Sequence, residues 1–121
     1  MNILGVDYGK KRIGLAWVQT GLDVVLPYGL VEGLEELVKL IKKEKIDKVV
    51  LGLPLGLSGE ENDNTRRVRA VAEKLKEQID LPVEFVDERF SSAQADNMGG
   101  EASRDEKAAM VILQNYLDMI K

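Results

Sequence analysis

The segment KVVLGLP (48–54) most constrains the fold, because it is a nearly continuous apolar run. Such a run is typical of a parallel strand that is covered on both faces of its sheet. Parallel strands are joined by crossover connections, which are usually helices packed on the sheet. The run therefore indicates a layered α/β domain, and 121 residues are enough for one such domain with its own core.

The rest of the chain alternates between strand and helix patterns. Further strands are predicted over 2–7, 12–18, 24–31 and 83–87. The first two form a hairpin around YGKK, and Pro27 favours an edge or irregular position for the third. Helices are predicted over about 34–44, from a cap at Asn64 or Thr65 to about 79, and over about 104–120. Ser103 and Glu106 have the spacing of a capping box before the last helix. The order β-β-β-α-β-α-β-α predicts one domain over 1–121, with functional groups at the carboxyl ends of its parallel strands.

The side chains available for chemistry are limited by composition, because the chain has no Cys and no His. Thiolate or imidazole metal sites, cysteine nucleophiles and histidine general bases are therefore excluded. Any acid–base or metal chemistry must use carboxylates, Lys, Tyr or hydroxyls.

Carboxylates lie where the predicted strands end and where the last helix begins. Asp7 ends the first strand, Asp87 and Glu88 end the strand at 83–87, and Asp105 opens the last helix. Each has an ordinary interpretation as a turn residue, a surface charge or a complement to the helix dipole. Together they would meet at one edge of the sheet, and clustered carboxylates are the ligands that Mg²⁺ or Mn²⁺ prefers.

Asp105 and the Asp87–Glu88 pair need separate consideration. Asp105 extends the apolar stripe of the last helix that continues with Ala108 and Ile112, so it should face the sheet. A charge in that position is costly unless it is paired or binds a cation. Alternation does not settle which acid of the pair binds metal, although the face of Asp87 looks the more buried.

Basic residues accompany these acids, at Lys10, Lys11 and Arg12, at Arg66, Arg67 and Arg69, and at Arg89. A net charge of −4 and a pI of about 4.9 argue against a general nucleic-acid binder. A local rim of positive charge could still contact phosphates, but solvated surface charge is an equally ordinary interpretation.

Five ordered segments resemble the YqgF (RuvX) family of small bacterial RNase H-like proteins: GVDYGKKRIGLAWV, VVLGLPLGLSGEEN, RRVRAVAEKL, VDERFSSAQA and DEKAAMVILQNYL. They span nearly the whole chain. The resemblance implies an RNase H-like fold with a five-stranded mixed sheet of order 3-2-1-4-5, flanked by helices. It also implies a nuclease that processes the 5′ end of precursor 16S rRNA in ribosome biogenesis, or a Holliday junction resolvase acting on branched DNA.

The resemblance also implies roles for individual residues. Its catalytic acids match Asp7, Glu88 with Asp87, and Asp105, of which Asp7, Glu88 and Asp105 would bind Mg²⁺ or Mn²⁺. Its nucleic-acid-binding positions match Lys11, Arg12, Arg66, Arg67 and Arg69. Arg89, which directly follows the acids at 87 and 88, is a further candidate for nucleic-acid binding. The partners would be structured RNA or branched DNA, and possible further partners are ribosomal particles.

Two other functions stay open at this point: a non-catalytic RNA- or ribosome-binding module, and an actin-like nucleotide-binding domain. No apolar run approaches the ~20 residues of a membrane span, and the N-terminus has no secretory signal pattern. We therefore expect a cytoplasmic protein that does not engage membranes, as a monomer or a weak homodimer.

Overall fold

The computed structural model describes residues 1–22, 24–88 and 99–120. The elements are β1 (Asn2–Tyr8), β2 (Ile13–Gln19), β3 (Leu26–Val31), α1 (Leu34–Lys43), β4 (Lys48–Leu53), α2 (Asp63–Gln78), β5 (Val83–Asp87) and α4 (Arg104–Ile120). Their types and order agree with those predicted from the sequence. The hairpin turn and the last helix also lie where the sequence places them.

The five strands form one mixed sheet in the order β3-β2-β1-β4-β5. The hairpin strands β1, β2 and β3 pair antiparallel, whereas β4 is parallel to both β1 and β5. Because β4 lies between two parallel neighbours, Val49, Val50 and Leu51 are fully buried. This confirms the interpretation of the apolar run. β3 is an edge strand, which accommodates Pro27.

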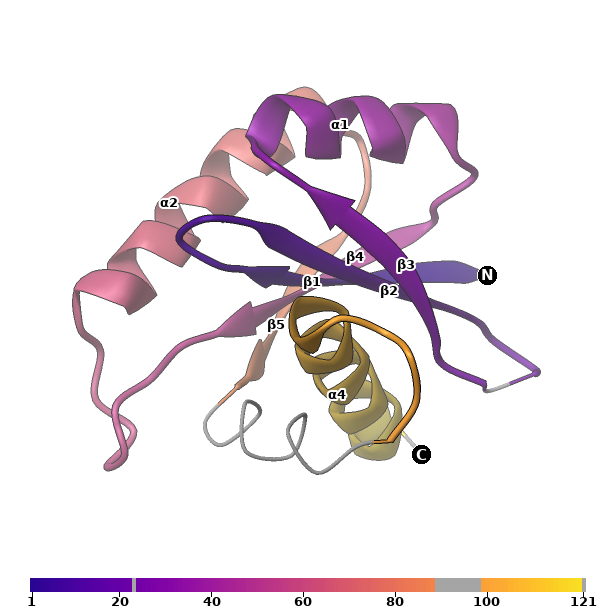
Figure 1. Ribbon diagram of the computed structural model, residues 1–121. Helices are drawn as coiled ribbons and strands as arrows, with labels where there is room; N and C mark the ends of the chain where they lie inside the picture. The colour runs from indigo at the N-terminus through magenta and orange to yellow at the C-terminus, as the bar shows by residue number, and fades with distance from the viewer. Residues whose placement is uncertain (23, 89–98, 121) are drawn as a thin grey trace.

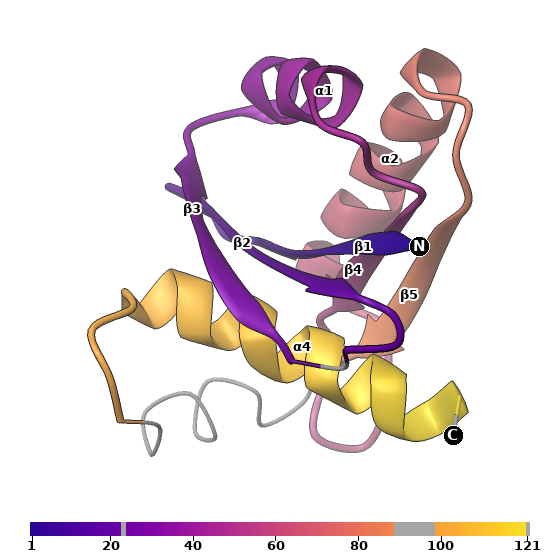
Figure 2. The same cartoon turned by 90° about the vertical axis from the view of Figure 1, so that its right-hand side faces the viewer.

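Helices cover both faces of the sheet: α1 and α2 lie on one face and α4 crosses the other (Figures 1 and 2). Each interface has its own apolar cluster. Leu4, Val6 and Leu15 point toward α1 and α2, whereas Ile3 and Val18 pack with the buried residues of α4. The alternation along β1 therefore assigns each of its side chains to one layer, and Asp7 belongs to the layer of α4.

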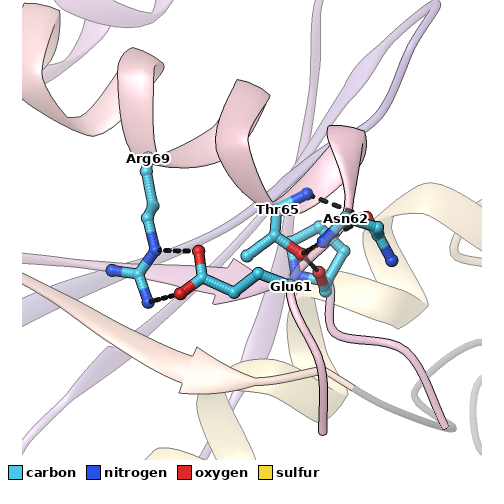
Figure 3. Close-up of polar contacts among 5 residues, drawn as sticks. Glu61, Asn62, Thr65 and Arg69 are labelled. Carbon is cyan, nitrogen blue, oxygen red and sulfur yellow. Dashed lines mark hydrogen bonds and ion pairs between the residues drawn. The ribbon is translucent and has the colours of Figure 1, made fainter.

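The start of α2 differs from the prediction, because its cap is Asn62 rather than Asn64 or Thr65. The Asn62 Oδ1 accepts from the Thr65 backbone N–H at 3.1 Å, and the Thr65 hydroxyl accepts from the Asn62 N–H at 3.1 Å (Figure 3). The Thr65 side chain also donates to the Pro54 carbonyl and is fully buried. Thr65 therefore lies inside a capping box and ties α2 to the end of β4.

The predicted capping box of α4 is confirmed. The Ser103 Oγ accepts from the Glu106 N–H at 3.2 Å, and Glu106 Oε1 accepts from the Ser103 N–H at 3.1 Å. The other oxygen of Glu106 accepts from the Gly29 N–H of β3 at 2.9 Å. Hydrogen bonds to both residues lower the pKa of Glu106 against the opposing effect of burial. The first turn of α4 is thus attached to the edge strand.

None of the helices in the described part of the chain is both long and apolar enough to span a membrane.

Candidate active site

The carboxyl end of β1 places Asp7 at the centre of the site. Asp7 is paired with Gly14 of β2 and lies on the α4 face of the sheet. Its side chain is half-buried. Next along the sheet, β4 and β5 end at the same edge, where β5 is followed by Glu88. The edge therefore brings together acids that are 81 positions apart in the sequence.

Asp7 and Glu88 form a carboxyl–carboxyl pair joined by a side-chain hydrogen bond. Burial, the charge of Asp7 and the hydrogen bond to it raise the pKa of Glu88 to about 8. Burial also raises the pKa of Asp7, although the hydrogen bond from Glu88 opposes this, and the charge of Asp105 adds to the increase. Two such groups cannot both be ionised at low cost, so Glu88 holds a proton and donates it to Asp7.

Two glycines in the strands make room for these acids. A Cβ on Gly52 of β4 would lie 2.6 Å from Glu88 Oε2, and a Cβ on Gly14 would lie 2.0 Å from the Asp105 carbonyl oxygen. Neither glycine was predicted from the sequence to contribute to the site. A glycine inside a strand is nevertheless a signal of close approach by another group, and both stand within otherwise apolar runs.

Asp105 lies in the first turn of α4, directly against Gly14, and is half-buried. Its charge acts on Asp7, so it is part of the same electrostatic site. Asp87 is exposed at the end of β5, and its charge reaches Glu88. The backbone N–H of Glu88 continues the pairing with β4 by donating to the Leu53 carbonyl at 3.1 Å. Of the two neighbouring acids, the structure thus brings Glu88 against Asp7, whereas the Asp87 side chain is exposed.

Arg67 is a basic residue whose charge reaches both acids, and the charge of Arg104 at the start of α4 also acts on Asp7. Its Nη2 donates to the Tyr8 carbonyl at 3.0 Å, and its guanidinium carbon lies 5.3 Å from the centre of the Tyr8 ring. Its positive charge lowers the pKa values of Asp7 and Glu88, opposing the larger effect of burial. Its Nε is buried and has no hydrogen-bond partner. Tyr8, which was not predicted from the sequence, therefore supports Arg67, an arginine whose charge acts on both acids of the pair.

The other predicted basic residues have different surroundings. Arg66 forms an exposed ion pair with Asp63. Arg69 binds Glu61 through Nε at 2.8 Å (Figure 3). The guanidinium carbon of Arg69 also lies 5.4 Å from the centre of the Phe85 ring. Lys11 and Arg12 are exposed in the β1–β2 turn, a few residues after Asp7 in the sequence. Arg89 lies outside the described residues.

The donor set can be compared with what a divalent metal requires. Mg²⁺ is commonly held by one or two carboxylates, with water and substrate phosphates completing its coordination. The Asp7–Glu88 pair supplies two such groups in contact, and the chain offers no softer nitrogen or sulfur ligand from His or Cys. No trio of acidic side chains in the described ranges converges closely enough to enclose an ion by itself. The residues present therefore fit a two-carboxylate site with Asp105 beside it.

The sheet order, the helix layers and the acids at the edge define a domain of the RNase H-like class. The solved structure of T. thermophilus RuvC in complex with a Holliday junction substrate has the same fold, with a TM-score of 0.69 at 11% identity, covering 98% of this chain and 96% of that one. A second Thermus thermophilus RuvC structure gives a TM-score of 0.64 over the same shares of both chains, also at 11% identity.

Sequence comparison identifies the particular family. The model described as "RuvX: Holliday junction resolvase" matches residues 1–119, and the chain belongs to this family. A Dictyoglomus turgidum protein named "Putative pre-16S rRNA nuclease" is 38% identical over 135 residues, covering 99% of this chain and 96% of the relative. A Maridesulfovibrio salexigens protein of the same name is 37% identical over 132 residues, covering 97% and 98%.

Proposed function

We propose that this protein is a divalent-metal-dependent endonuclease that cleaves precursor 16S rRNA near its 5′ end. The observation that carries the proposal is the Asp7–Glu88 pair, two half-buried acids in contact at the edge of the sheet. The names of the full-length relatives point to the same substrate. Asp7 and Glu88 are the proposed ligands of Mg²⁺ or Mn²⁺ in the described arrangement, and Asp105, which lies beside them, is the proposed third ligand once an ion draws the acids together. When bound, such an ion supplies an activated water and neutralises charge on the phosphate.

The chain's own residues have separable tasks in this proposal. Asp7 is fixed by the β1–β2 register, and Glu88 by its backbone hydrogen bond to Leu53. The proton that Glu88 donates to Asp7 must leave before both groups can act as ligands, so loading releases a proton. Arg67 holds the Tyr8 carbonyl and keeps one positive charge beside the two acids. Lys11 and Arg12 are exposed in the adjacent turn, where they can contact the phosphates that flank the cleaved bond.

The test is Mn²⁺-dependent cleavage of an RNA that contains the 5′ precursor end of 16S rRNA. Asp7→Asn and Glu88→Gln each remove one ligand charge at almost unchanged volume, and we expect each to lower the rate by at least about a hundredfold. Asp87→Asn is the matched control, because it removes a charge from the neighbouring exposed position. We expect its rate to stay within about threefold of wild type, as for a surface substitution.

A four-way DNA junction belongs in the same experiment, because the family description and the RuvC neighbour name that substrate. Faster cleavage of the junction than of the RNA would replace the proposed substrate and keep the proposed site. Cleavage of neither substrate by the wild type would instead favour a non-catalytic RNA-binding module. Equal cleavage by wild type and Asp7→Asn would refute the assignment of the site.

A further inference from the structure

A second concave site lies at the far end of the sheet from Asp7. It is a surface pocket of about 420 Å³, lined chiefly by Trp17, Tyr28, Lys43, Glu44 and Lys45. Its volume is within the ~300–1,000 Å³ range of small-molecule sites. Trp17 pairs with Leu4, near the start of β1, and faces the layer of α1 and α2. The pocket therefore differs from the carboxylate site both in sheet face and in sheet end.

The aromatic walls of the pocket suit a flat ring. Trp17 and Tyr28 are in an edge-to-face arrangement, with ring centres 6.4 Å apart and planes at 82°. A planar group stacked on one of these rings meets the other with its edge, and both arrangements are favourable for aromatic pairs. The remaining lining residues are Asn2 and Ile46, of which Ile46 is apolar. The pocket can thus bury the face of an aromatic heterocycle.

The acidic groups around the pocket have hydrogen-bond partners, whereas two of its lysines form no ion pair with a described residue. The Glu44 carboxylate is hydrogen-bonded to the Tyr28 hydroxyl, whose pKa is raised by burial and by this contact. The Asp47 carboxylate accepts from the Asn2 N–H at 2.7 Å. Lys43 and Lys45 are exposed and make no ion pair with any described residue. The rim therefore offers unpaired positive charge beside an aromatic pocket, on a protein whose net charge is −4.

We propose that this pocket binds an unpaired nucleotide of single-stranded RNA, with its base stacked on the free face of one of the two aromatic rings, Trp17 or Tyr28, and its phosphates near Lys43 and Lys45. Stacking on aromatic side chains beside a basic groove is how many proteins hold single strands. The inference rests on the proposed function in one respect, the choice of RNA as the ligand. Trp17 pairs with Leu4, which lies three residues before Asp7 along β1, a distance of about 10 Å. Trp17 also lies on the opposite face of the sheet from Asp7. The nucleotide in this pocket is therefore not one of the two that are joined by the cleaved phosphodiester bond.

Trp17 is the only tryptophan of the chain, so its fluorescence reports on the pocket directly. The full-length protein in EDTA is titrated with a short uridine-rich RNA, an abasic ribose-phosphate chain of equal length and a DNA of the same sequence. We expect saturable quenching with the RNA and no quenching with the abasic chain. Lys43→Gln combined with Lys45→Gln should weaken RNA binding roughly fivefold and reduce the log–log salt slope by about 1.4, for two lost phosphate contacts. Tyr28→Ala should weaken it at least about fivefold by removing a stacking surface.

Lys74→Gln is the matched control, because Lys74 is an exposed lysine on another helix, α2. Equal weakening by this variant would show general electrostatic attraction and overturn the proposal, as would equal quenching by the abasic chain. Equal affinity for the DNA would overturn the assignment to RNA. The binding is measured without metal and with Asp7→Asn as well as wild type, so it is independent of cleavage. If the wild type does not cleave the RNA but its Trp17 fluorescence is quenched, the proposed function alone is refuted. If the wild type cleaves the RNA but shows no quenching, this pocket alone is refuted.

Discussion

Glu88→Gln should stabilise the metal-free protein at pH 8 and have little effect at pH 5. In the wild type, burial and Asp7 raise the pKa of Glu88 from 4.5 to about 8. Between these values the folded state holds a proton that the unfolded state releases. Because the folded state binds more protons in this window, the free energy of unfolding decreases as the pH rises. The contribution of the Glu88 proton to the free energy of unfolding is fully present below about pH 4.5. It decreases as the pH rises and is lost once the pH passes about 8.

The size of the effect follows from the same interval. One pH unit of displacement corresponds to about 1.4 kcal/mol, so the interval from 4.5 to about 8 sets a ceiling near 5 kcal/mol. Glu88 is still partly exposed, and solvent screens its interaction with Asp7. We therefore expect a loss on the order of 3 kcal/mol between pH 5 and pH 8. A glutamine keeps a hydrogen-bond donor for Asp7 and cannot ionise, so the variant should lack this loss.

The measurement is urea unfolding in EDTA, followed by Trp17 fluorescence and circular dichroism at several pH values from 5 to 8.5. The window is clean because the chain has no histidine, the one side chain that ordinarily titrates there. Asp87→Asn is the control, and it should retain most of the wild-type pH dependence. Added Mn²⁺ should stabilise the wild type more than Glu88→Gln, because the proposed site would hold the ion in the folded state through both carboxylates. A wild-type stability that is flat from pH 5 to 8 would refute the reasoning, as would an equal decline in Glu88→Gln.

Three further predictions concern the residues that support the site. Arg67→Gln should lower the cleavage rate by a factor of about 10 to 100, as for residues that orient metal ligands, whereas Arg66→Gln should change it by no more than about twofold. Equal rates for these two variants would contradict the role given to Arg67. Gly14→Ala places a methyl group against the Asp105 carbonyl, so we expect a loss of about 1–3 kcal/mol in urea unfolding together with weaker Mn²⁺ binding. Thr65→Val removes the hydroxyl that bonds the Asn62 N–H and the Pro54 carbonyl, and it leaves these polar groups without that partner. Thermal or urea unfolding should show that the free energy of unfolding falls by about 1–3 kcal/mol.

The fold could be predicted because each local pattern agrees with the final packing. The run at 48–54 is apolar on both faces since β4 lies between two parallel strands with helices on either side. Pro27 is tolerated because β3 is at the edge. The cap of α2 was misplaced because several polar residues precede the helix, and local sequence does not show that Thr65 is drawn inward by the Pro54 carbonyl. That contact depends on where β4 ends in three dimensions.

The choice between Asp87 and Glu88 shows why the site was harder to predict. Val83 and Phe85 made the face of Asp87 look buried, but Val86 on the other face is only 3% exposed. Both faces of β5 are covered, one by the layer of α1 and α2 and the other by α4, so alternation of apolar residues does not distinguish them. The distinction comes from Gly52 on the neighbouring strand, which leaves space on the α4 face for Glu88. Sequence patterns along one strand do not contain that information.

The energetic cost of the Asp7–Glu88 pair is itself an argument for function. Acids placed for stability are usually matched by cations, as Glu84 is here by Lys48 at 2.9 Å and by the Tyr116 hydroxyl at 2.6 Å, which lower the pKa of Glu84. Asp7 and Glu88 instead face each other with a third acid nearby, and the counter-charge of Arg67 is outweighed by burial. At pH 8, replacing Glu88 with a neutral side chain is expected to stabilise the metal-free fold, so stability does not explain the arrangement. A ligand that carries positive charge would reverse the sign of the interaction, and perturbed acids held in that state are a property of functional sites.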